Sequence, residues 1–372
     1  MLDKIVFEGY KSFKEKTELE VKPITILFGK NSSGKSAVAK LPTLIEEALA
    51  SSFSEPLMYI NKGIELGAGY RDLFYKGEFQ GEILLHLIEG HKELKISIIN
   101  GVPTPLISQL ETKLEGGWIK YDFTSNTEKS ALKEILMDKD TSNNHFNLTT
   151  DYIGPFRLKP HRIFYISEFA KSNYLGILGD KAYYLLAKDE KLENKVSEWF
   201  ENNFDGWKLF VDKKDPYYEV KIRRSNDWDG VNIVDVGQGM SQALPIIIKA
   251  LSDYKDNFVL NILEQPELHL HPAAHGNLAE LLYNSTLNSK NKYLIETHSQ
   301  NFILRLRTLI AQGKMKKDDL NLCFIDYDEE KDSSILKKIN VNDLGEVDFW
   351  PENIFNETYN EAIALKNAQK GK

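Results

Sequence analysis

The sequence of 372 residues contains one cysteine, Cys323, which excludes a disulfide within the chain and is typical of a reducing compartment. It contains no apolar run near the roughly 18 residues that span a bilayer. The opening Met1-Leu2-Asp3-Lys4 lacks the pattern of a signal peptide. From these absences we predict a cytoplasmic protein with no membrane segment.

A basic excess is also missing, because 47 lysines and arginines stand against 55 aspartates and glutamates. Proteins that coat nucleic acid usually carry a basic surplus, so the net charge of −8 restricts any DNA contact to a local patch. We find no long low-complexity segment and no repeat of solenoid period. The apolar and charged fractions, 42% and 27%, are those of a globular protein with more than one ordinary domain.

The most informative stretch has the spacing of a phosphate-binding P-loop, with two glycines four residues apart followed by Lys and Ser. Its residues are Gly29, Lys30, Asn31, Ser32, Ser33, Gly34, Lys35 and Ser36. Glycines let such a loop curl with its N–H groups inward, and the following helix adds positive charge at its start. We expect ATP here, with Lys35 at the β- and γ-phosphates and Ser36 as a Mg²⁺ ligand.

The flanks of this loop support the interpretation. Residues 23–28 form an apolar run of strand formers, and residues 37–50 are mostly helix formers, although Pro42 should kink or interrupt that helix. A chance Gly/Ser turn on the surface is the alternative, and the strand–loop–helix context argues against it.

A second glycine-rich segment, residues 234–242, precedes an apolar helical run at 243–251. Gly237 and Gly239 at a helix N-terminus would form another anion site. Because Pro245 is tolerated only in a first helical turn, we expect this helix to begin near Ser241.

Two further segments each end an apolar strand in a polar group. Residues 258–264 end in Glu264, and residues 292–295 are followed shortly by His298. A buried parallel strand would hold Glu264 beside the P-loop, where it can bind Mg²⁺ directly or through water, and His298 could reach a γ-phosphate.

Other expectations concern the rest of the chain. Tyr10 and Phe13 could stack on adenine, although core packing is favoured. Arg157 follows a Gly-Pro turn and could face a phosphate or partner, or be an ordinary surface arginine. The further expected elements are strands at 83–88, 94–99, 162–166, 207–211, 217–222 and 335–341, helices at 127–137, 182–200, 273–287 and 301–310, and a loop at 138–150.

Four motifs occur in a fixed order along the chain: the P-loop, the glycine-rich segment, LEQPELHLHP and ETHS. This arrangement resembles the ABC-type ATPases of the SMC/RecF and OLD group. The stretches IETHSQNFILRLRTLIAQGKM and LGEVDFWPENIF are similar to bacterial AAA-family ATPases with a conserved C-terminal domain of unknown function. The resemblance implies an α/β P-loop NTPase fold of ABC-ATPase type, with a mixed sheet core, an antiparallel β-rich N-terminal part and an inserted helical lobe.

We expect four regions. Residues 1–51 would hold the N-terminal strands and P-loop, 52–230 a β-rich and helical insertion lobe, 231–312 the second half of the ATPase core, and 313–372 a β-hairpin and tail. No glutamine for a γ-phosphate-sensing loop of transporter type is identifiable in 52–150.

The resemblance also implies roles for individual residues. Ser36 and Glu264 would hold Mg²⁺, and His298 would be the switch histidine. Gly237 and Gly239, with Ser241, would contact the γ-phosphate of the opposite protomer. In this family two heads enclose two nucleotides, so a homodimer is implied.

One departure from the family pattern concerns catalysis. Gln265 stands where the family has a glutamate that acts as general base, and losing such a base slows chemistry by ~10²–10⁴-fold. Either Gln265 is a deliberate replacement that traps the ATP state, or the natural protein is a slow ATPase. In addition, Gly237 occupies the position of the signature serine.

Two alternative sites follow from clustered side chains. Zinc could use a cluster with suitable spacing, although a structural role is favoured; its members are Glu267, His269, His271 and His275. A nuclease could use four acids near the C-terminus, although a solvated hairpin tip is favoured; they are Asp326, Asp328, Glu329 and Glu330.

The main functional hypothesis is an ATP-driven switch that dimerises around ATP and controls a partner effector, with bacterial anti-phage defence as the setting that the resemblance suggests. A non-hydrolysing ATP-bound scaffold or sensor is the first alternative, and a nuclease using the C-terminal acids is the second.

Overall fold

The computed structural model describes most of the chain. The described residues are 2–50, 55–101, 104–114, 117–121, 146, 148–165, 174–225, 229–252, 258–287, 289–352 and 354–370. The expected helix at 127–137 and most of the expected loop at 138–150 lie outside them. None of the helices in these ranges is both long and apolar enough to cross a lipid bilayer.

The central sheet has six strands in the order β10-β15-β16-β3-β17-β18. The first five run parallel and β18 pairs antiparallel with β17, so the sheet is mixed as predicted. The strands are β10 (Thr150–Ile153), β15 (Leu260–Glu264), β16 (Lys292–Glu296), β3 (Ile24–Gly29), β17 (Leu320–Asp328) and β18 (Ser333–Ile339). β10, β15 and β3 are buried along their whole length, as expected for parallel strands covered on both faces.

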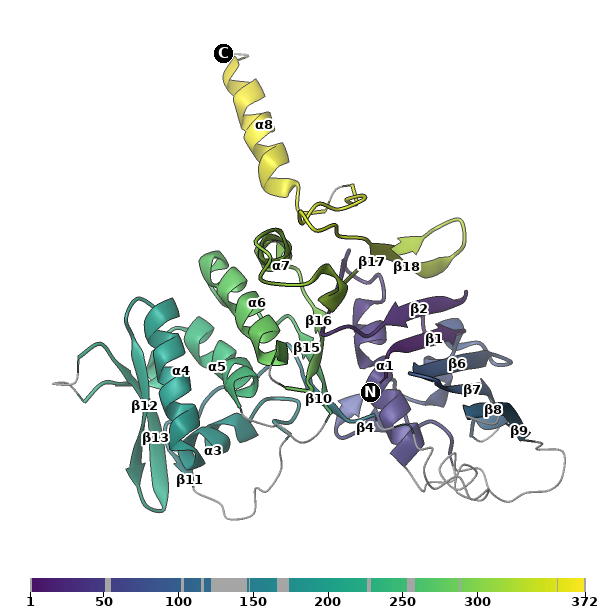
Figure 1. Ribbon diagram of the computed structural model, residues 1–372, viewed down its shortest axis with the longest axis horizontal. Coiled ribbons are helices and arrows are strands. Elements are labelled where there is room, and N and C mark those ends of the chain that lie inside the picture. Colours follow the sequence, from purple (N-terminus) through teal and green to yellow (C-terminus); the bar gives the residue numbers. More distant parts are fainter. Residues whose placement is uncertain are drawn as a thin grey trace.

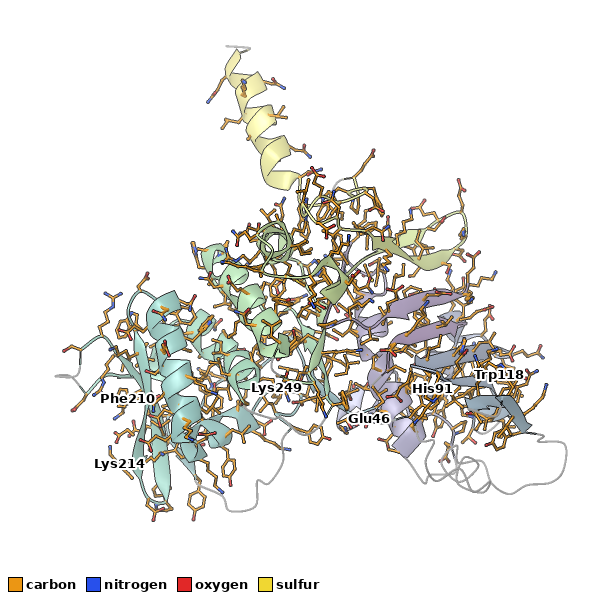
Figure 2. All side chains as sticks on the ribbon, in the orientation of Figure 1. Glu46, His91, Trp118, Phe210, Lys214 and Lys249 are labelled. Carbon is orange, nitrogen blue, oxygen red and sulfur yellow. The ribbon has the colours of Figure 1, made fainter. Side chains whose placement is uncertain are left out.

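Helices cover both faces of this sheet (Figure 1). One face packs against α5 (Gln238–Leu251), α6 (Pro272–Leu287) and α7 (Gln300–Ala311), and the other against α1 (Lys35–Ala50). Neighbouring residues of β10 point to opposite faces. Asp151 pairs with Lys249 of α5, whereas Thr150 donates to Glu46 of α1. Figure 2 labels Lys249 and Glu46 on the two sides of the central strands. The P-loop helix and the helix after the second glycine-rich segment therefore lie on opposite faces.

A second sheet covers the α1 side and is entirely antiparallel, with the order β2-β1-β6-β7-β8-β9. Its strands are β1 (Lys4–Glu8), β2 (Thr17–Glu20), β6 (Glu82–Glu89), β7 (Lys92–Ile99), β8 (Leu106–Leu114) and β9 (Gly117–Tyr121). The strands predicted at 83–88 and 94–99 are confirmed. Tyr10 and Phe13 are fully buried and meet Phe7 edge-on, so the expected core packing is confirmed.

A third unit lies beyond α5 and combines helices with a small sheet (Figure 1). It contains β11 (Phe164–Tyr165), α3 (Lys181–Lys188), α4 (Glu190–Asn203), β12 (Lys208–Lys214), β13 (Tyr217–Arg223), β14 (Val231–Asn232) and η3 (Ile233–Asp235). The prediction of a single helix at 182–200 is wrong, because α3 ends at Lys188 and a second helix begins after Asp189. The carboxylate of Asp189 accepts the N–H groups of Lys191 and Leu192, which caps α4 and starts a new helix.

The described residues between 52 and 230 therefore contribute to four sheets, the fourth being the two-stranded sheet of β4 (Ile60–Asn61) and β5 (Ile64–Glu65). They also form the short elements η1 (Tyr70–Leu73) and η2 (Tyr75–Gly77). Helix α1 runs from Lys35 to Ala50 with Pro42 inside it, so the helix is not interrupted there.

The C-terminal part begins with η4 (Lys317–Asp319) and the β17–β18 hairpin. Trp350 then stacks on Phe28 of β3, which ties this segment to the central sheet. The last helix, α8 (Glu357–Lys370), extends away from the rest of the molecule (Figure 1).

Candidate ATP-binding site

The P-loop connects β3 to α1 and depends on two glycines in backbone conformations that disfavour other residues. Gly29 has φ +152° and Gly34 has φ +100°. A Cβ on Gly29 would lie 1.9 Å from the carbonyl oxygen of Ile325, and one on Gly34 would lie 2.7 Å from Ser12 Oγ. Neither position has room for a side chain, so both require glycine.

Lys35 begins α1 and is almost completely buried. Its ammonium group donates to the carbonyl oxygens of Gly29 at 3.1 Å and of Lys30 at 2.5 Å, so it lies across the loop. Burial lowers the pKa of this amine, while the nearby Glu296 carboxylate raises it. These carbonyl partners are exchangeable for phosphate oxygens, which bind an ammonium group more strongly.

The remaining loop residues divide by exposure. Lys30, Asn31 and Ser32 are exposed, and the amine of Lys30 lies 3.5 Å from Asp326 of β17. Ser33 is 1% exposed, and its hydroxyl oxygen has no hydrogen-bond partner. A buried hydroxyl without a partner is uncommon and fits a group that awaits a ligand.

Two acidic side chains lie where β15 and β16 end. Glu264 and Glu296 are direct partners in the strand register, and both are about 95% buried, with exposures of 5% and 4%. Ser36 Oγ donates to Glu296 Oε2 over 2.8 Å. Glu264 Oε1 has no hydrogen-bond partner and lies 4.0 Å from the amine of Lys40.

Both carboxyl groups have raised pKa values, mainly because burial disfavours their charged forms. For Glu264 the Lys40 ammonium counteracts part of this rise, and the charge of Glu296 adds to it. For Glu296 the Ser36 hydrogen bond and the Lys35 charge lower the pKa again. This edge of the sheet therefore concentrates negative charge that a cation would stabilise.

Gln265 follows Glu264 and has a left-handed backbone, with φ +46°. Its N–H donates to the carbonyl oxygen of Glu296 at 2.7 Å. Arg157 donates through Nη2 to the carbonyl oxygens of Gln265, at 2.7 Å, and of Glu264, at 3.1 Å. Contacts on both sides thus hold a conformation that is costly for a residue with a Cβ.

Arg157 is 6% exposed, so the interpretation as a surface arginine is wrong. Its Nε and Nη1 atoms have no hydrogen-bond partner. Burial lowers the pKa of the guanidinium to about 10, against the opposing effect of Glu267. Arg157 therefore supports the turn that carries Gln265.

Glu267 holds the segment that contains His298. One oxygen of Glu267 accepts the hydroxyl of Thr297 at 2.6 Å and the backbone N–H of His298 at 3.0 Å. The His298 side chain is exposed, and partial desolvation followed by the Lys35 charge lowers its pKa. A neutral imidazole beside the P-loop can both donate and accept a hydrogen bond.

The second glycine-rich segment leads directly into α5, which begins at Gln238 and not near Ser241, so the expected start is wrong. The argument from Pro245 fails because another group replaces the missing helical bond. Pro245 has no N–H for the carbonyl of Ser241, and the hydroxyl of Tyr183 donates to that carbonyl at 3.3 Å. A side chain 58 residues away thus permits a proline in the helix interior.

The two glycines of this segment differ in their surroundings. A Cβ on Gly237 would meet nothing within 4 Å, and the residue is exposed. A Cβ on Gly239 would lie 2.6 Å from the carbonyl oxygen of His269, so the helix start packs against the turn after β15. Ser241 is buried and its hydroxyl donates to the carbonyl of Gln238 at 3.2 Å.

The two alternative sites find no geometric support. Within the described ranges, no three His, Cys, Asp or Glu side chains are arranged to hold a metal ion. His275 is occupied by hydrogen bonds with Ser299 Oγ and the Leu270 carbonyl. The C-terminal acids lie at the β17–β18 turn, where Asp328 accepts the N–H groups of Glu330 and Lys331. This is the solvated hairpin tip that the sequence favoured.

The structure brings Lys35, Ser36, Glu264 and His298 to one edge of the central sheet, at the carboxyl ends of its parallel strands. Ligands of α/β sheets bind at this edge. Sequence reasoning missed Glu296 and left the place of Arg157 open. The ETHS motif contained the signal for Glu296, because its acid directly follows an apolar run and is the last residue of a strand that pairs with β3, which leads into the P-loop.

The fold is that of a P-loop nucleoside-triphosphatase. Residues 166–303 match the model of a family described as "AAA ATPase domain". The match includes Gly237, Glu264 and His298 and does not extend to the P-loop. No curated protein sequence matches the chain.

Solved structures extend the likeness to the whole fold. An SMC head bound to the C-winged helix domain of ScpA is 14% identical with a TM-score of 0.51, covering 91% of this chain and 98% of that one. The SMC head domain from Thermotoga maritima is 13% identical with a TM-score of 0.49, at 91% and 99% coverage. The Smc head domain bound to the C-terminal domain of ScpA derived from Pyrococcus furiosus is 13% identical with a TM-score of 0.46, at 91% and 96%. The chain therefore has the fold of an SMC head, and its residues 166–303 are similar to an AAA ATPase domain.

Proposed function

We propose that this protein is an ATP-dependent molecular switch that closes into a homodimer around Mg²⁺ and ATP and controls a partner protein. The observation that carries the proposal is the meeting of Lys35, Ser36, Glu264 and His298 at one edge of the central sheet. These are the group types that hold a triphosphate and its metal ion.

The residues present fit this cofactor. Ser33 Oγ and Glu264 Oε1 are buried without hydrogen-bond partners. The Lys35 amine donates to two carbonyl oxygens of the loop, which phosphate oxygens could replace. Ser36 and Glu264 would hold Mg²⁺ together with oxygen atoms of the phosphates and of water. When bound, the ion would neutralise charge on the phosphates during hydrolysis.

The arrangement of the helices supports a dimer. Because α1 and α5 lie on opposite faces of the central sheet, we infer that Gly237 meets the phosphates of a second copy and not its own. The exposed backbone at Gly237 leaves space for that approach. Two nucleotides would then be enclosed between two chains, in an isologous contact with twofold symmetry.

Gln265 supports slow hydrolysis. In that reaction a water oxygen bonds to the γ-phosphorus, the bond to the β–γ bridging oxygen breaks, and ADP, phosphate and a proton leave. An amide can hydrogen-bond the water but cannot take its proton. The ATP-bound dimer would therefore be long-lived, as a switch requires, and opening would follow hydrolysis.

The partner would be an effector protein such as a nuclease, toxin or DNA complex, in a cytoplasmic anti-phage setting. This step rests on the resemblance of the motifs to bacterial AAA-family ATPases and on the SMC head whose structure holds the winged-helix domain of ScpA. The net charge of −8 gives no support to DNA coating by the chain itself.

A second candidate is an ATP-bound scaffold that does not hydrolyse, and Gln265 is the observation that favours it. In this case ATP would order the dimer without turnover. The two candidates share the nucleotide site and differ in whether the bound ATP is hydrolysed.

Measuring the mass of particles in solution with and without ATP and Mg²⁺ tests the switch. We expect ATP to convert monomer to dimer in the unaltered chain and to leave Lys35→Ala monomeric. A bulky residue at the open position, Gly237→Tyr, should bind ATP normally and fail to dimerise.

The paired variants separate binding from closure. Dimerisation of Gly237→Tyr at wild-type ATP concentrations would contradict the sandwich geometry. A monomer at saturating ATP in the unaltered chain would contradict the dimer itself.

A further inference from the structure

A second buried carboxylate lies at the nucleotide site and has no role in the function proposed so far. Glu296 ends β16, as Glu264 ends β15, and the two residues are direct register partners. The carboxylate of Glu296 therefore lies at the same edge of the sheet as the P-loop helix, with which it makes a direct contact.

That contact is with the serine expected to bind the metal ion. Ser36 Oγ donates its single hydrogen to Glu296 Oε2 over 2.8 Å. A hydroxyl has one hydrogen and two lone pairs, so a fixed direction for the hydrogen also fixes the direction of the lone pairs. Glu296 thus orients the oxygen that Ser36 can offer to a cation, in the way that outer carboxylates orient the ligands of metal sites.

The charges at this edge are incompletely balanced. Glu264 and Glu296 are both about 95% buried, and Glu264 Oε1 has no hydrogen-bond partner. The nearest cation to Glu264 is Lys40, at the long distance of 4.0 Å, and the Lys35 amine is engaged by loop carbonyls. Two neighbouring buried carboxylates repel each other, and a divalent cation between them would remove that repulsion.

A third buried glutamate, Glu267, differs from Glu296 in its contacts. One oxygen of Glu267 accepts from Thr297 and from the backbone of His298, the other has no hydrogen-bond partner, and the buried guanidinium of Arg157 is its charged neighbour. Glu296 instead makes its hydrogen bond to a P-loop side chain and is the register partner of another acid. The contact with Ser36 is therefore what distinguishes Glu296 from Glu267.

We propose that Glu296 is a second carboxylate of the Mg²⁺ site, which orients Ser36 and shares the ion with Glu264. This assignment rests on the ATP-binding function proposed above. A pair of carboxylates together with phosphates is an arrangement that Mg²⁺ accepts.

The test is the dependence of nucleotide affinity on the metal ion, measured without turnover. ATP affinity is titrated in Mg²⁺ and in EDTA for the unaltered chain, Glu296→Gln and Glu296→Asp. We expect Glu296→Gln to bind ATP in EDTA at least as well as the unaltered chain and to lose ~10–100-fold of the gain that Mg²⁺ provides. Glu296→Asp, which keeps the charge, should retain part of that gain.

A second readout follows the ion itself and the free protein. The paramagnetic resonance signal of Mn²⁺ with ATP should show weaker binding to Glu296→Gln. Without ligand, the melting temperature of Glu296→Gln should equal or exceed that of the unaltered chain, because one of two repelling charges is gone. Glu46→Gln is the matched control, since Glu46 is a buried glutamate paired with Lys62 and Thr150 away from the site.

The outcomes are distinguishable from a failure of ATP binding as such. If Glu296→Gln and Glu296→Asp both keep the full Mg²⁺ gain while Glu264→Gln loses it, Glu296 is not part of the metal site. If Glu296→Gln does not fold, the test depends on Glu296→Asp. In that case an increase in ATP affinity with Mg²⁺ as large as that of the unaltered chain would overturn the assignment. If the unaltered chain binds no ATP, the proposed function fails first.

Discussion

Carboxylates gather at two places in this chain, and the two places differ in how their oxygens are used. At the ends of β15 and β16, Glu264 and Glu296 are buried, and one oxygen of Glu264 has no partner. At the β17–β18 tip, Glu330 is exposed and Asp328 accepts two backbone N–H groups of its own turn. A cluster of acids in a sequence is thus a weak sign of a site, whereas burial with an unmet hydrogen-bonding need is a strong one.

The largest expected effect concerns the chemistry at the buried edge. Gln265→Glu should raise the rate of ATP hydrolysis by ~10²–10⁴-fold if the protein is a slow switch, because a carboxylate can accept the proton of the attacking water. Steady-state phosphate release measures it. The charge and shape of the rest of the site stay nearly the same, so ATP affinity serves as the control.

An unchanged rate in Gln265→Glu, with ATP still bound, would instead favour the scaffold. It would mean that this edge of the sheet holds the nucleotide without being arranged for its hydrolysis.

The next effect separates the P-loop from the hairpin tip. Lys35→Ala should weaken ATP binding by ~100-fold, because it removes charge-assisted hydrogen bonds to phosphate that are each worth ~1.5–3 kcal/mol. Lys331→Ala removes a lysine that pairs with Glu15 near the tip and should leave ATP affinity unchanged. Titration of a fluorescent ATP analogue measures both. Equal affinities in the two variants would place the nucleotide elsewhere.

A smaller effect compares the two glycines of the second glycine-rich segment. Gly239→Ala should lower the free energy of unfolding by ~1–3 kcal/mol, because its Cβ would overlap the carbonyl of His269. In Gly237→Ala the added Cβ would meet no atom within 4 Å, so the free energy of unfolding should change by less than ~0.5 kcal/mol. Denaturant unfolding of the two variants gives the difference. Similar losses in both would mean that the start of α5 does not pack on the turn after β15.

The smallest effect is expected at the exposed acids. Glu330→Gln should alter neither ATP affinity nor hydrolysis, and should change stability by less than ~0.5 kcal/mol. Metal-dependent DNA cleavage that is present in the unaltered chain and absent in Glu330→Gln would reverse the comparison and restore the nuclease interpretation.

The parts of the fold that depend on neighbours in sequence were predictable. The P-loop glycines, the strand that ends at Glu264 and the helices around 273–287 and 301–310 all follow from local spacing and apolar patterns. These elements also carry most of the candidate site, which explains why its expected residues lie together.

The parts that depend on distant contacts were not predictable. Glu296 meets Ser36 across 260 residues of sequence, and Arg157 meets the Glu264 carbonyl across 107. The start of α5 was placed too late for the same reason, because a distant tyrosine replaces the bond that Pro245 lacks. The break at Asp189 is different, since a capping aspartate is a local signal.

The central claim is that a triphosphate and its metal ion lie between the P-loop and the acids at the ends of β15 and β16. Calorimetric titration of the unaltered chain with ATP, in Mg²⁺ and in EDTA, tests it most directly. The account predicts one ATP per chain and tighter binding in Mg²⁺. Absence of binding, or an affinity that Mg²⁺ does not change, would contradict it.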